Sequence, residues 1–255
     1  DMAQRHGEMQ WVTKIYSALD ENRFLLYAQP IVPIKSQSKQ HYELLLRMKD
    51  PSSEIIAPGN FLPAAERYDI IQQLDLWVIE HSFKLLSQST DFLESINFVS
   101  INLSGKSLSS KNLLETIIAT LETTSISADK ICFEITETAA IANFNNALNF
   151  INVLKGRGFR FALDDFGTGL SSFEYLKKMP VDFLKIDGIF IKEITENPID
   201  YELVKSINGI GHVMGMKTIA EFVENDEILS KLAGLEVDYA QGYGMGMPVP
   251  LEPLI

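Results

Sequence analysis

Residues 131–165 read ICFEITETAAIANFNNALNFINVLKGRGFRFALDD and contain two apolar, strand-like runs separated by a helix-like stretch. The two runs are Ile131–Thr136 and Phe159–Leu163, and both have the length of a typical strand. Between them, apolar residues such as Phe144 and Ala147 recur at helical spacing. A strand, a helix and a strand in this order are typical of an α/β fold with a largely parallel sheet.

Strand-like runs recur on both sides of this stretch, again with helical periodicity between them. The runs are Phe24–Ile31, Tyr42–Arg47, Phe98–Asn102, Ile131–Thr136, Phe159–Leu163, Phe183–Ile186, Thr218–Ala220 and Val237–Ala240. Eight strands within 255 residues predict a single closed barrel of the TIM-like (β/α)8 type. Helices are expected to cover the outside of this barrel.

The start of the chain differs from the rest because it is polar and precedes the first strand-like run. Val12, Ile15 and Leu19 follow helical spacing there. We therefore expect a linker helix over residues 1–22 and the barrel domain over residues 23–255. The chain starts with Asp1 rather than methionine, so we expect a piece of a longer protein, whose other parts can be tethered to a membrane.

The overall charge limits the classes of partner. The formal net charge is −12, and this disfavours a nucleic-acid polymer as partner, because such a partner requires a basic face. A small phosphate-containing ligand remains possible, since metal ions can hold it. The one cysteine, Cys132, excludes an intrachain disulfide and suggests a reducing compartment. With no membrane span or signal segment, we predict a cytoplasmic domain.

Polar residues concentrate where the predicted strands end. They are Asn102, Glu134, Glu137, Asp164, Asp165, Lys185, Asp187, Glu221, Glu224 and Gln241, with Glu43 near the start of its run. Taken alone, each carboxylate is more simply explained as a surface charge or a helix cap. The carboxyl ends of barrel strands meet at one mouth, however, and active sites lie there. Together, these residues predict a polar site at that mouth.

The cluster favours metal-dependent chemistry on phosphate. Closely spaced carboxylates resist ionising together unless cations compensate them. The candidate ligands are oxygen atoms, without a cysteine pair or histidines at ligand spacing, so Mg²⁺ or Mn²⁺ is favoured over zinc. Adjacent Asp164 and Asp165 suit two ions about 4 Å apart, an arrangement used for in-line attack of water on phosphate. Phe166–Gly169 (FGTG) follows directly and is expected to be a mobile loop over the site.

From roughly Phe24 to Pro250, the chain resembles the EAL-domain cyclic diguanylate (c-di-GMP) phosphodiesterases. Seven motifs stand in family order: Glu43-Leu44-Leu45, Ile101–Ser104 (INLS), Phe133–Glu137 (FEITE), Asp164–Gly169 (DDFGTG), Lys185–Asp187 (KID), Ala220–Glu224 (AEFVE) and Gln241–Tyr243 (QGY). The resemblance implies hydrolysis of c-di-GMP to linear pGpG with two Mg²⁺ or Mn²⁺ ions. It also implies a barrel in which one strand is antiparallel to the others.

The same resemblance implies roles for individual residues. The implied metal ligands are Glu43, Asn102, Glu134, Asp164, Asp165 and Glu221, with Asp164 bridging the two ions. Glu43, Lys185 and Glu221 are the implied catalytic residues. Lys185 would orient or help deprotonate the attacking water. A plain salt bridge from Lys185 to Asp187 is the alternative.

Further roles concern the substrate and the loop. The implied substrate-binding residues are Gln29, Arg47, Asp187, Gln241 and Pro248, and Gln241 would also support the metal cluster. Arg47 offers a bidentate fork that suits a phosphate oxygen. Glu137 would anchor the loop, with residues 168–172 as its target, and Thr168 is the second implied loop-anchoring residue. Leu44 and Phe222 depart from the residues usual in the family, but neither departure removes an oxygen ligand.

The resemblance also suggests partners. A homodimer through the helices after the Asp164–Asp165 loop is expected, together with an upstream GGDEF or sensory domain, because Arg5–Phe24 resembles a linker after a GGDEF domain. A c-di-GMP receptor without activity and an unrelated metal-dependent barrel, such as a lyase or phosphosugar enzyme, are the alternatives. The complete ligand set argues against the first, and seven ordered motifs argue against the second.

Overall fold

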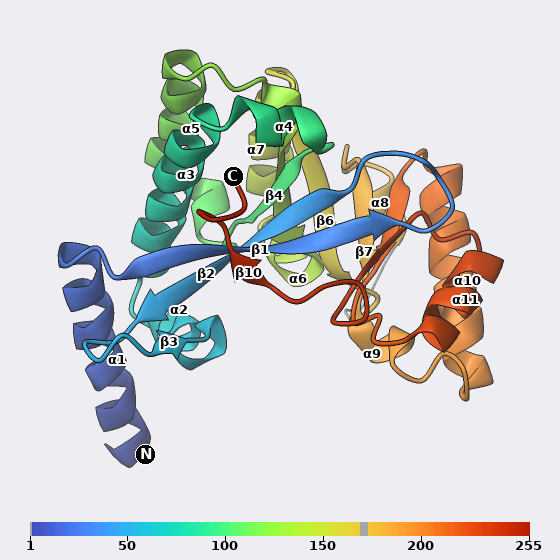
Figure 1. The fold of residues 1–255 in the computed structure, drawn as a ribbon, viewed down its shortest axis with the longest axis horizontal. Helices are drawn as coiled ribbons and strands as arrows, with labels where there is room; N and C mark the ends of the chain where they lie inside the picture. Colours follow the sequence, from blue (N-terminus) through green and yellow to red (C-terminus); the bar gives the residue numbers. More distant parts are fainter. Residues whose placement is uncertain (1, 169–172) are drawn as a thin grey trace.

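Eight strands close into a barrel in the computed structural model, which describes residues 2–168 and 173–255 (Figure 1). The barrel strands are β1 (Phe24–Pro33), β2 (His41–Lys49), β4 (Val99–Asn102), β5 (Ile131–Thr136), β6 (Arg160–Phe166), β7 (Phe183–Ile186), β8 (Lys217–Ala220) and β9 (Tyr239–Gln241). The barrel closes because β1 pairs with both β2 and β9, and both pairings are antiparallel. The other neighbours are parallel. This confirms the TIM-like barrel with one antiparallel strand, and β1 is that strand.

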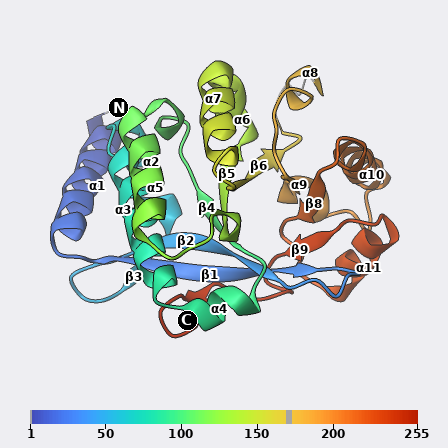
Figure 2. The same ribbon diagram turned by 90° about the horizontal axis from the view of Figure 1, so that it is seen from above.

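Helices lie outside the strands, as Figure 2 shows for α3, α5, α7, α10 and α11. Their bounds are α1 (Met2–Asp20), α2 (Leu62–Arg67), α3 (Ile71–Ser87), α4 (Thr90–Ser95), α5 (Lys111–Thr123), α6 (Glu137–Ala142), α7 (Phe144–Lys155), α8 (Phe173–Leu176), α9 (Gly188–Ile191), α10 (Pro198–Val213) and α11 (Asp226–Gly234). Short 3-10 turns are η1 (Pro58–Asn60), η2 (Ser107–Ser109) and η3 (Ala128–Lys130). The helices bury their apolar faces against the barrel, which leaves the two barrel ends for polar groups.

All eight predicted runs are strands, and the bounds of β5 and β7 agree with the prediction. The bounds of the other six differ by one to three residues, and β9, for example, begins at Tyr239 rather than Val237. The helical stretch after β5 also differs, since it breaks at Asn143 into α6 and α7. Two strands of two residues each, β3 (Ile55–Ile56) and β10 (Val249–Pro250), were not predicted. Strands this short are below the length at which alternation gives a signal.

An apolar plug fills the barrel near the amino-terminal ends of its parallel strands. It contains Ile31, Phe98, Cys132, Ala162, Phe183, Ile219 and Tyr239. The fully buried His41 ring lies among them, with its centroid 4.1 Å from that of Phe98. Burial, with a smaller effect of the Lys185 charge, lowers the pKa of His41 to about 3. His41 is therefore a neutral core side chain, and the plug leaves the opposite mouth for the charged residues.

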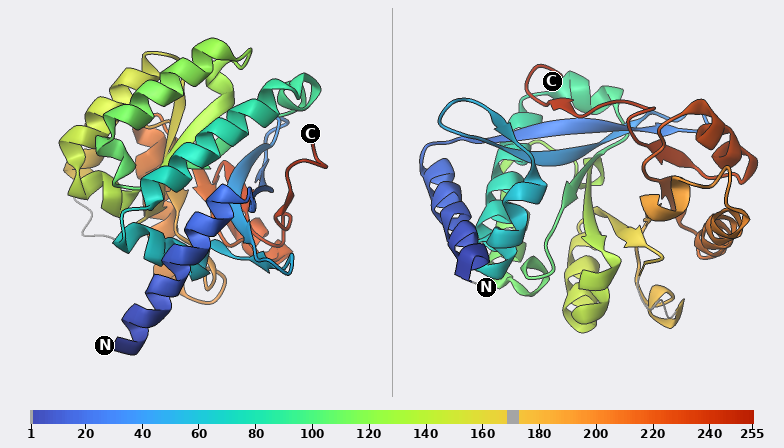
Figure 3. Two further views of the ribbon diagram at one scale, coloured as in Figure 1. Left: turned by 90° about the vertical axis from the view of Figure 1, so that its left-hand side faces the viewer. Right: turned by 90° about the horizontal axis from the view of Figure 1, so that it is seen from below.

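Helix α1 forms a separate small core with α2 and the start of α3, at one end of the molecule (Figure 3). Ile15 and Ala18 are buried in this core, and Trp11, Val12 and Leu19 pack beside them. The helix predicted at the start of the chain is present, whereas its role as a linker stays a prediction. Among the described residues, no helix is both long and apolar enough to cross a membrane. The predicted cytoplasmic location stays a prediction.

Candidate active site

Lys185 lies at the centre of the carboxylate cluster predicted at the barrel mouth. Its side chain is fully buried on β7. The Nζ atom is 2.7 Å from Glu134 Oε2, 3.1 Å from Glu221 Oε1, 3.2 Å from Asp164 Oδ1 and 3.3 Å from Glu43 Oε2. These carboxylates come from β2, β5, β6 and the residue after β8. The barrel therefore brings together charges from four separate parts of the chain.

Two amide side chains orient Glu43, and a third, Gln29, contacts one of them. Asn102 Nδ2 donates to Glu43 Oε1 at 2.6 Å, and Gln241 Nε2 donates to Glu43 Oε2 at 2.6 Å. Gln241 Nε2 also lies 3.2 Å from Gln29 Oε1, while Gln29 Nε2 donates to the carbonyl oxygen of Gly246 at 3.1 Å. Because both amide donors point at Glu43, the side-chain oxygens of Asn102 and Gln241 remain available as acceptors or ligands.

The cluster changes the proton affinity of its members. Burial raises the pKa of Glu134 well above its ordinary value, with Lys185 opposing and the neighbouring carboxylates adding to the shift. For Glu43, Lys185 and the amide hydrogen bonds outweigh burial, so its pKa is lowered. Burial would lower the pKa of Lys185, but the surrounding carboxylates raise it well above its ordinary value. Lys185 is therefore an ammonium group in this arrangement.

A second group of carboxylates shares Asp164 and Glu221 with the first and adds Asp165. Oxygen atoms of Asp164, Asp165 and Glu221 lie within 4.8 Å of one another, close enough to hold one ion. Burial, followed by the charges of Asp164 and Asp187, raises the pKa of Asp165 to about 6. Burial also raises the pKa of Glu221 to about 8. Without a cation, Asp165 and Glu221 therefore tend to retain protons, as expected where negative charge is undercompensated.

Charge and an unsatisfied oxygen atom show that the site fits divalent cations. When ionised, Glu43, Glu134, Asp164, Asp165 and Glu221 set five negative charges against the single ammonium of Lys185. The remaining four charges equal those that two divalent cations would supply. Within the described part of the chain, Glu134 Oε1 is a buried oxygen without a hydrogen-bond donor. A hard cation prefers such oxygen ligands.

Glu137 connects the site to the loop after β6. It is the first residue of α6 and is buried, with Thr136 capping the helix through its side chain. Glu137 Oε2 accepts a hydrogen bond from the Gly167 amide at 2.9 Å, and Oε1 accepts one from the Tyr175 hydroxyl. Gly167 has φ +107°, and a Cβ there would lie 2.7 Å from the Phe190 ring. Only glycine fits without rearrangement, which fixes where Glu137 meets the loop.

The mouth opens into a pocket of about 250 Å³. Its lining includes Gln29, Glu43, Arg47, Glu221, Gln241 and Pro248. Arg47 Nη1 donates to the carbonyl oxygen of Leu46 at 2.9 Å, and its guanidinium lies 5.3 Å from the Tyr27 ring centroid. The pocket thus joins the carboxylate cluster to a cationic fork and to amide groups, which suits a ligand with phosphate and polar ring atoms.

A family model described as the EAL domain matches residues 13–248. The chain belongs to the EAL-domain family. It is 42% identical over 252 residues to the cyclic di-GMP phosphodiesterase PdeB of Shewanella oneidensis, covering 98% of this chain and 29% of that protein. It is 37% identical over 240 residues to the cyclic di-GMP phosphodiesterase PdeF of Escherichia coli, covering 94% of this chain and 32% of that protein. The chain thus spans less than a third of either relative.

Solved structures of EAL domains are similar to the whole chain. The PaMucR phosphodiesterase in complex with c-di-GMP superposes with a TM-score of 0.90 at 30% identity, covering 96% of this chain and 100% of that one. The FimX EAL domain of Pseudomonas aeruginosa bound to c-di-GMP has a TM-score of 0.86 at 28% identity, covering 93% of this chain and 96% of that one. These agreements support the barrel assignment independently of the motifs.

In this EAL domain, most predicted site residues lie together, and two are placed differently. Asp187 caps α9 by accepting the Ile189 amide at 2.8 Å, and it lines a neighbouring hollow rather than the pocket beside Glu43. Thr168 donates its hydroxyl to the Asp165 carbonyl oxygen at 3.1 Å. The rest of the predicted anchoring segment, residues 169–172, lies outside the described residues. The alternative salt bridge from Lys185 to Asp187 is not among the described contacts of either residue.

Two aromatic residues of the EAL domain line the pocket without having been assigned a role. Tyr243 is 65% exposed and Phe222 is 50% exposed at the pocket wall. Phe222 has φ +54°, and its ring fills the space that a Cβ on Gly188 would need. An aromatic residue with positive φ strains the backbone. The phenylalanine within a site motif was therefore the sequence signal that could have pointed to this position.

Proposed function

We propose that this EAL domain hydrolyses c-di-GMP to linear pGpG with two divalent cations. The observation that carries the proposal is the group of five carboxylates around one buried lysine, opening into a pocket with a cationic fork. The names of the relatives support the reaction, and the solved EAL domains that hold c-di-GMP support the ligand. A phosphodiester needs charge compensation and an activated water, and this site suits both needs.

The residues proposed to hold the cations are Glu43, Asn102, Glu134, Asp164, Asp165 and Glu221, with Asp164 shared. When bound, the ions would supply Lewis acidity that lowers the pKa of water and offsets the charge of the phosphate. We favour Mg²⁺ or Mn²⁺ because every proposed ligand atom is oxygen. Asp165 is the most exposed of these carboxylates, so solvent reaches this proposed ligand most readily.

Lys185, Glu43 and Glu221 are proposed to act in the reaction itself. The Lys185 ammonium is within 3.3 Å of four carboxylates, so its position is fixed in all directions. A fixed ammonium can orient the attacking water and stabilise charge that develops on the phosphate oxygens. Glu43, on β2, and Glu221, after β8, would hold the same ammonium group from two separate parts of the barrel. Glu43 is buried and Glu221 is partly buried, which limits the access of bulk water to it.

The pocket residues are proposed to bind the substrate. Arg47 would donate its guanidinium fork to a phosphate oxygen, and Gln29 would hydrogen-bond a guanine. Gln241 and Pro248 would complete the wall, since both line the pocket. For Asp187, a direct contact with substrate stays a prediction, because it lines the adjoining hollow. Glu137 is proposed to hold the loop after Asp165, including Thr168, in the form that keeps Asp165 at the site.

The proposal includes two larger partners. We propose a homodimer through α8 to α10, since α10 exposes apolar Ile199 and Leu203 at 69% and 40%. We also propose an upstream GGDEF or sensory domain joined through α1. One relative, MucR of Pseudomonas aeruginosa, is named a bifunctional diguanylate cyclase and cyclic di-GMP phosphodiesterase, and it is 30% identical over 253 residues.

The decisive experiment is hydrolysis of c-di-GMP by the purified chain with Mg²⁺ or with Mn²⁺, followed by chromatography for pGpG. A matched reaction with EDTA and a direct c-di-GMP binding assay are run in parallel. Metal-dependent formation of pGpG is the expected result. Tight binding without product would instead indicate a c-di-GMP receptor, and neither binding nor product would refute both assignments.

A further inference from the structure

A buried acid outside the site holds the backbone that follows Asn102. Asp75 lies on α3 and is only 7% exposed. Its Oδ2 atom accepts hydrogen bonds from the Ser104 amide at 2.9 Å and the Ser107 hydroxyl at 2.6 Å. Ser104 Oγ in turn donates to Ser107 Oγ at 3.1 Å. Asp75 therefore closes a small network around the turn that leads from β4 into η2.

This network begins where the sheet stops. Leu103 N still donates to the Glu134 carbonyl oxygen at 2.9 Å, as β4 pairs with β5. The next amide, Ser104, has no strand to pair with and donates to Asp75 instead. A buried amide without an acceptor would be costly, so Asp75 both extends the ladder by one bond and fixes the course of the chain.

The orientation of the Asn102 side chain depends on the path of this turn, because Asn102 is exposed at the end of β4. Its Nδ2 must reach Glu43 Oε1 at 2.6 Å for its amide oxygen to lie beside the carboxylates. A second contact from the same helix supports the turn, since Gln72 Nε2 donates to the Lys106 carbonyl oxygen at 2.9 Å. Helix α3 thus holds both sides of the turn, and Asp75 supplies its buried contact.

We propose that Asp75 is a positioning residue for the metal site, acting through the Ser104–Ser107 turn on the orientation of Asn102. The proposal rests on the proposed function, in which Asn102 is a cation ligand. Groups that orient ligands from outside commonly change metal affinity by 10- to 100-fold when they are removed. Asp75 contributes through geometry, so an acceptor of the same shape should replace it.

The test measures Mn²⁺ binding by calorimetry without substrate, on the whole chain. Asp75→Leu should raise the Kd for Mn²⁺ by about tenfold or more. Asp75→Asn should stay close to wild type, because its amide oxygen can accept both bonds. Ser82→Ala is the matched control, since Ser82 is a buried residue of the same helix whose hydroxyl has no hydrogen-bond partner within the described chain.

Thermal unfolding of each variant separates positioning from stability. A folded Asp75→Leu variant that binds Mn²⁺ with the wild-type Kd would overturn the proposal, even if its melting temperature falls. If that variant does not fold, Ser107→Ala carries the test: it should weaken Mn²⁺ binding to a smaller extent, and an unchanged Kd would overturn the proposal. A wild type that binds Mn²⁺ but leaves c-di-GMP intact would refute the proposed hydrolysis, while the comparison of Kd values would still decide the role of Asp75.

Discussion

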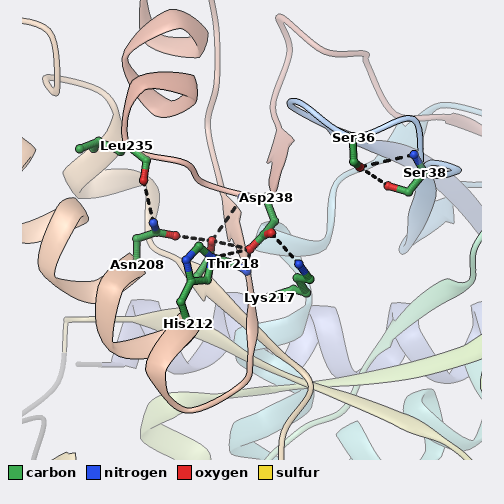
Figure 4. A network of polar contacts seen from close by, with 8 residues as sticks. All are labelled: Ser36, Ser38, Asn208, His212, Lys217, Thr218, Leu235 and Asp238. Atoms are coloured by element: carbon green, nitrogen blue, oxygen red, sulfur yellow. Dashed lines mark hydrogen bonds and ion pairs between the residues drawn. The ribbon is translucent and has the colours of Figure 1, made fainter.

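The amino-terminal end of the barrel surrounds its partly buried acids with donors, whereas the carboxyl-terminal mouth crowds acids around one lysine. At the amino-terminal end, Asp238 accepts hydrogen bonds from the Thr218 amide at 2.9 Å and from His212 Nε2 at 2.7 Å, and Lys217 Nζ lies 3.1 Å away (Figure 4). These contacts outweigh burial and lower the pKa of Asp238. At the mouth, burial and like charges raise the pKa of Glu221 to about 8.

The amino-terminal arrangement occurs twice. Asp182 stands one residue before β7, as Asp238 stands one residue before β9. Asp182 Oδ2 accepts the Phe161 amide at 2.9 Å, and its Oδ1 lies 2.6 Å from Lys155 Nζ. In both cases an aspartate ahead of one strand satisfies an amide near the start of the previous strand and pairs with a lysine. The repetition indicates that these aspartates fix the amino-terminal ends of neighbouring strands relative to each other.

The difference between the ends separates stability from function. A carboxylate with its donors in place favours the folded state. Carboxylates that lack donors oppose each other, and such sites are kept where a ligand or reaction compensates them. The crowded carboxylates at the mouth therefore lower the stability of the fold. The hydrogen-bonded carboxylates at the opposite end can offset this loss. Substitutions at the mouth should therefore reduce activity, whereas substitutions at the amino-terminal end should reduce stability.

The largest effect is expected at the mouth, from Glu43→Ala. Loss of one ligand and of the contact with Lys185 should reduce pGpG formation by about a thousandfold or more, since metal assistance is worth several kcal/mol. The barrel should remain folded, because the change removes one of several crowded carboxylates. Initial rates measure the loss of pGpG formation, and circular dichroism checks that the barrel is folded. Glu227→Ala, an exposed change on α11, is the control, and a folded Glu43→Ala variant with the wild-type rate would contradict the assignment.

Asp238→Ala should produce the opposite pattern. It leaves the Thr218 amide and His212 without their acceptor, so the free energy of unfolding should fall by about 2–3 kcal/mol. Hydrolysis per folded molecule should be unchanged, since the plug separates Asp238 from the mouth. Urea unfolding and rates normalised to folded protein measure this. A large loss of rate at full stability would show that the two ends are coupled.

A smaller effect is expected from Glu137→Ala, which acts on the site through the loop. The variant removes the acceptor of the Gly167 amide and the Tyr175 hydroxyl, so loop order should fall and activity should drop by about tenfold. Hydrogen exchange at Gly167, measured together with hydrolysis, tests the link. Normal protection and full activity would refute the anchoring role.

The smallest effect concerns acid stability at Asp238. Its folded pKa is lowered, so its contribution is present above the unfolded pKa of about 3.9 and is lost as pH falls through the folded pKa. The difference in unfolding free energy between wild type and Asp238→Ala should therefore shrink below about pH 4. Urea titrations at neutral and acid pH measure it. A difference that does not change with pH would show that the contacts do not depend on charge.

Much of the fold was predictable because strand alternation and helical spacing are local properties. Ile131–Thr136 and Phe183–Ile186 were predicted with the observed bounds for this reason. Acidic residues at strand ends predicted the mouth, because parallel strands place those ends together. Only the family resemblance predicted that one strand is antiparallel, and the structure identified this strand as β1. Alternation reads the same in either chain direction, so residues 24–33 could not reveal it.

Short stretches of sequence predicted the eight barrel strands, the carboxylate and amide candidates for the site, and the family. The tertiary fold, rather than any motif, places Lys185 among four carboxylates and not beside Asp187. It also brought Asp75 to Ser104, and His41 into the plug. The physical reason is distance along the chain: Lys185 and Glu43 are 142 positions apart, and only barrel closure sets them 3.3 Å from each other.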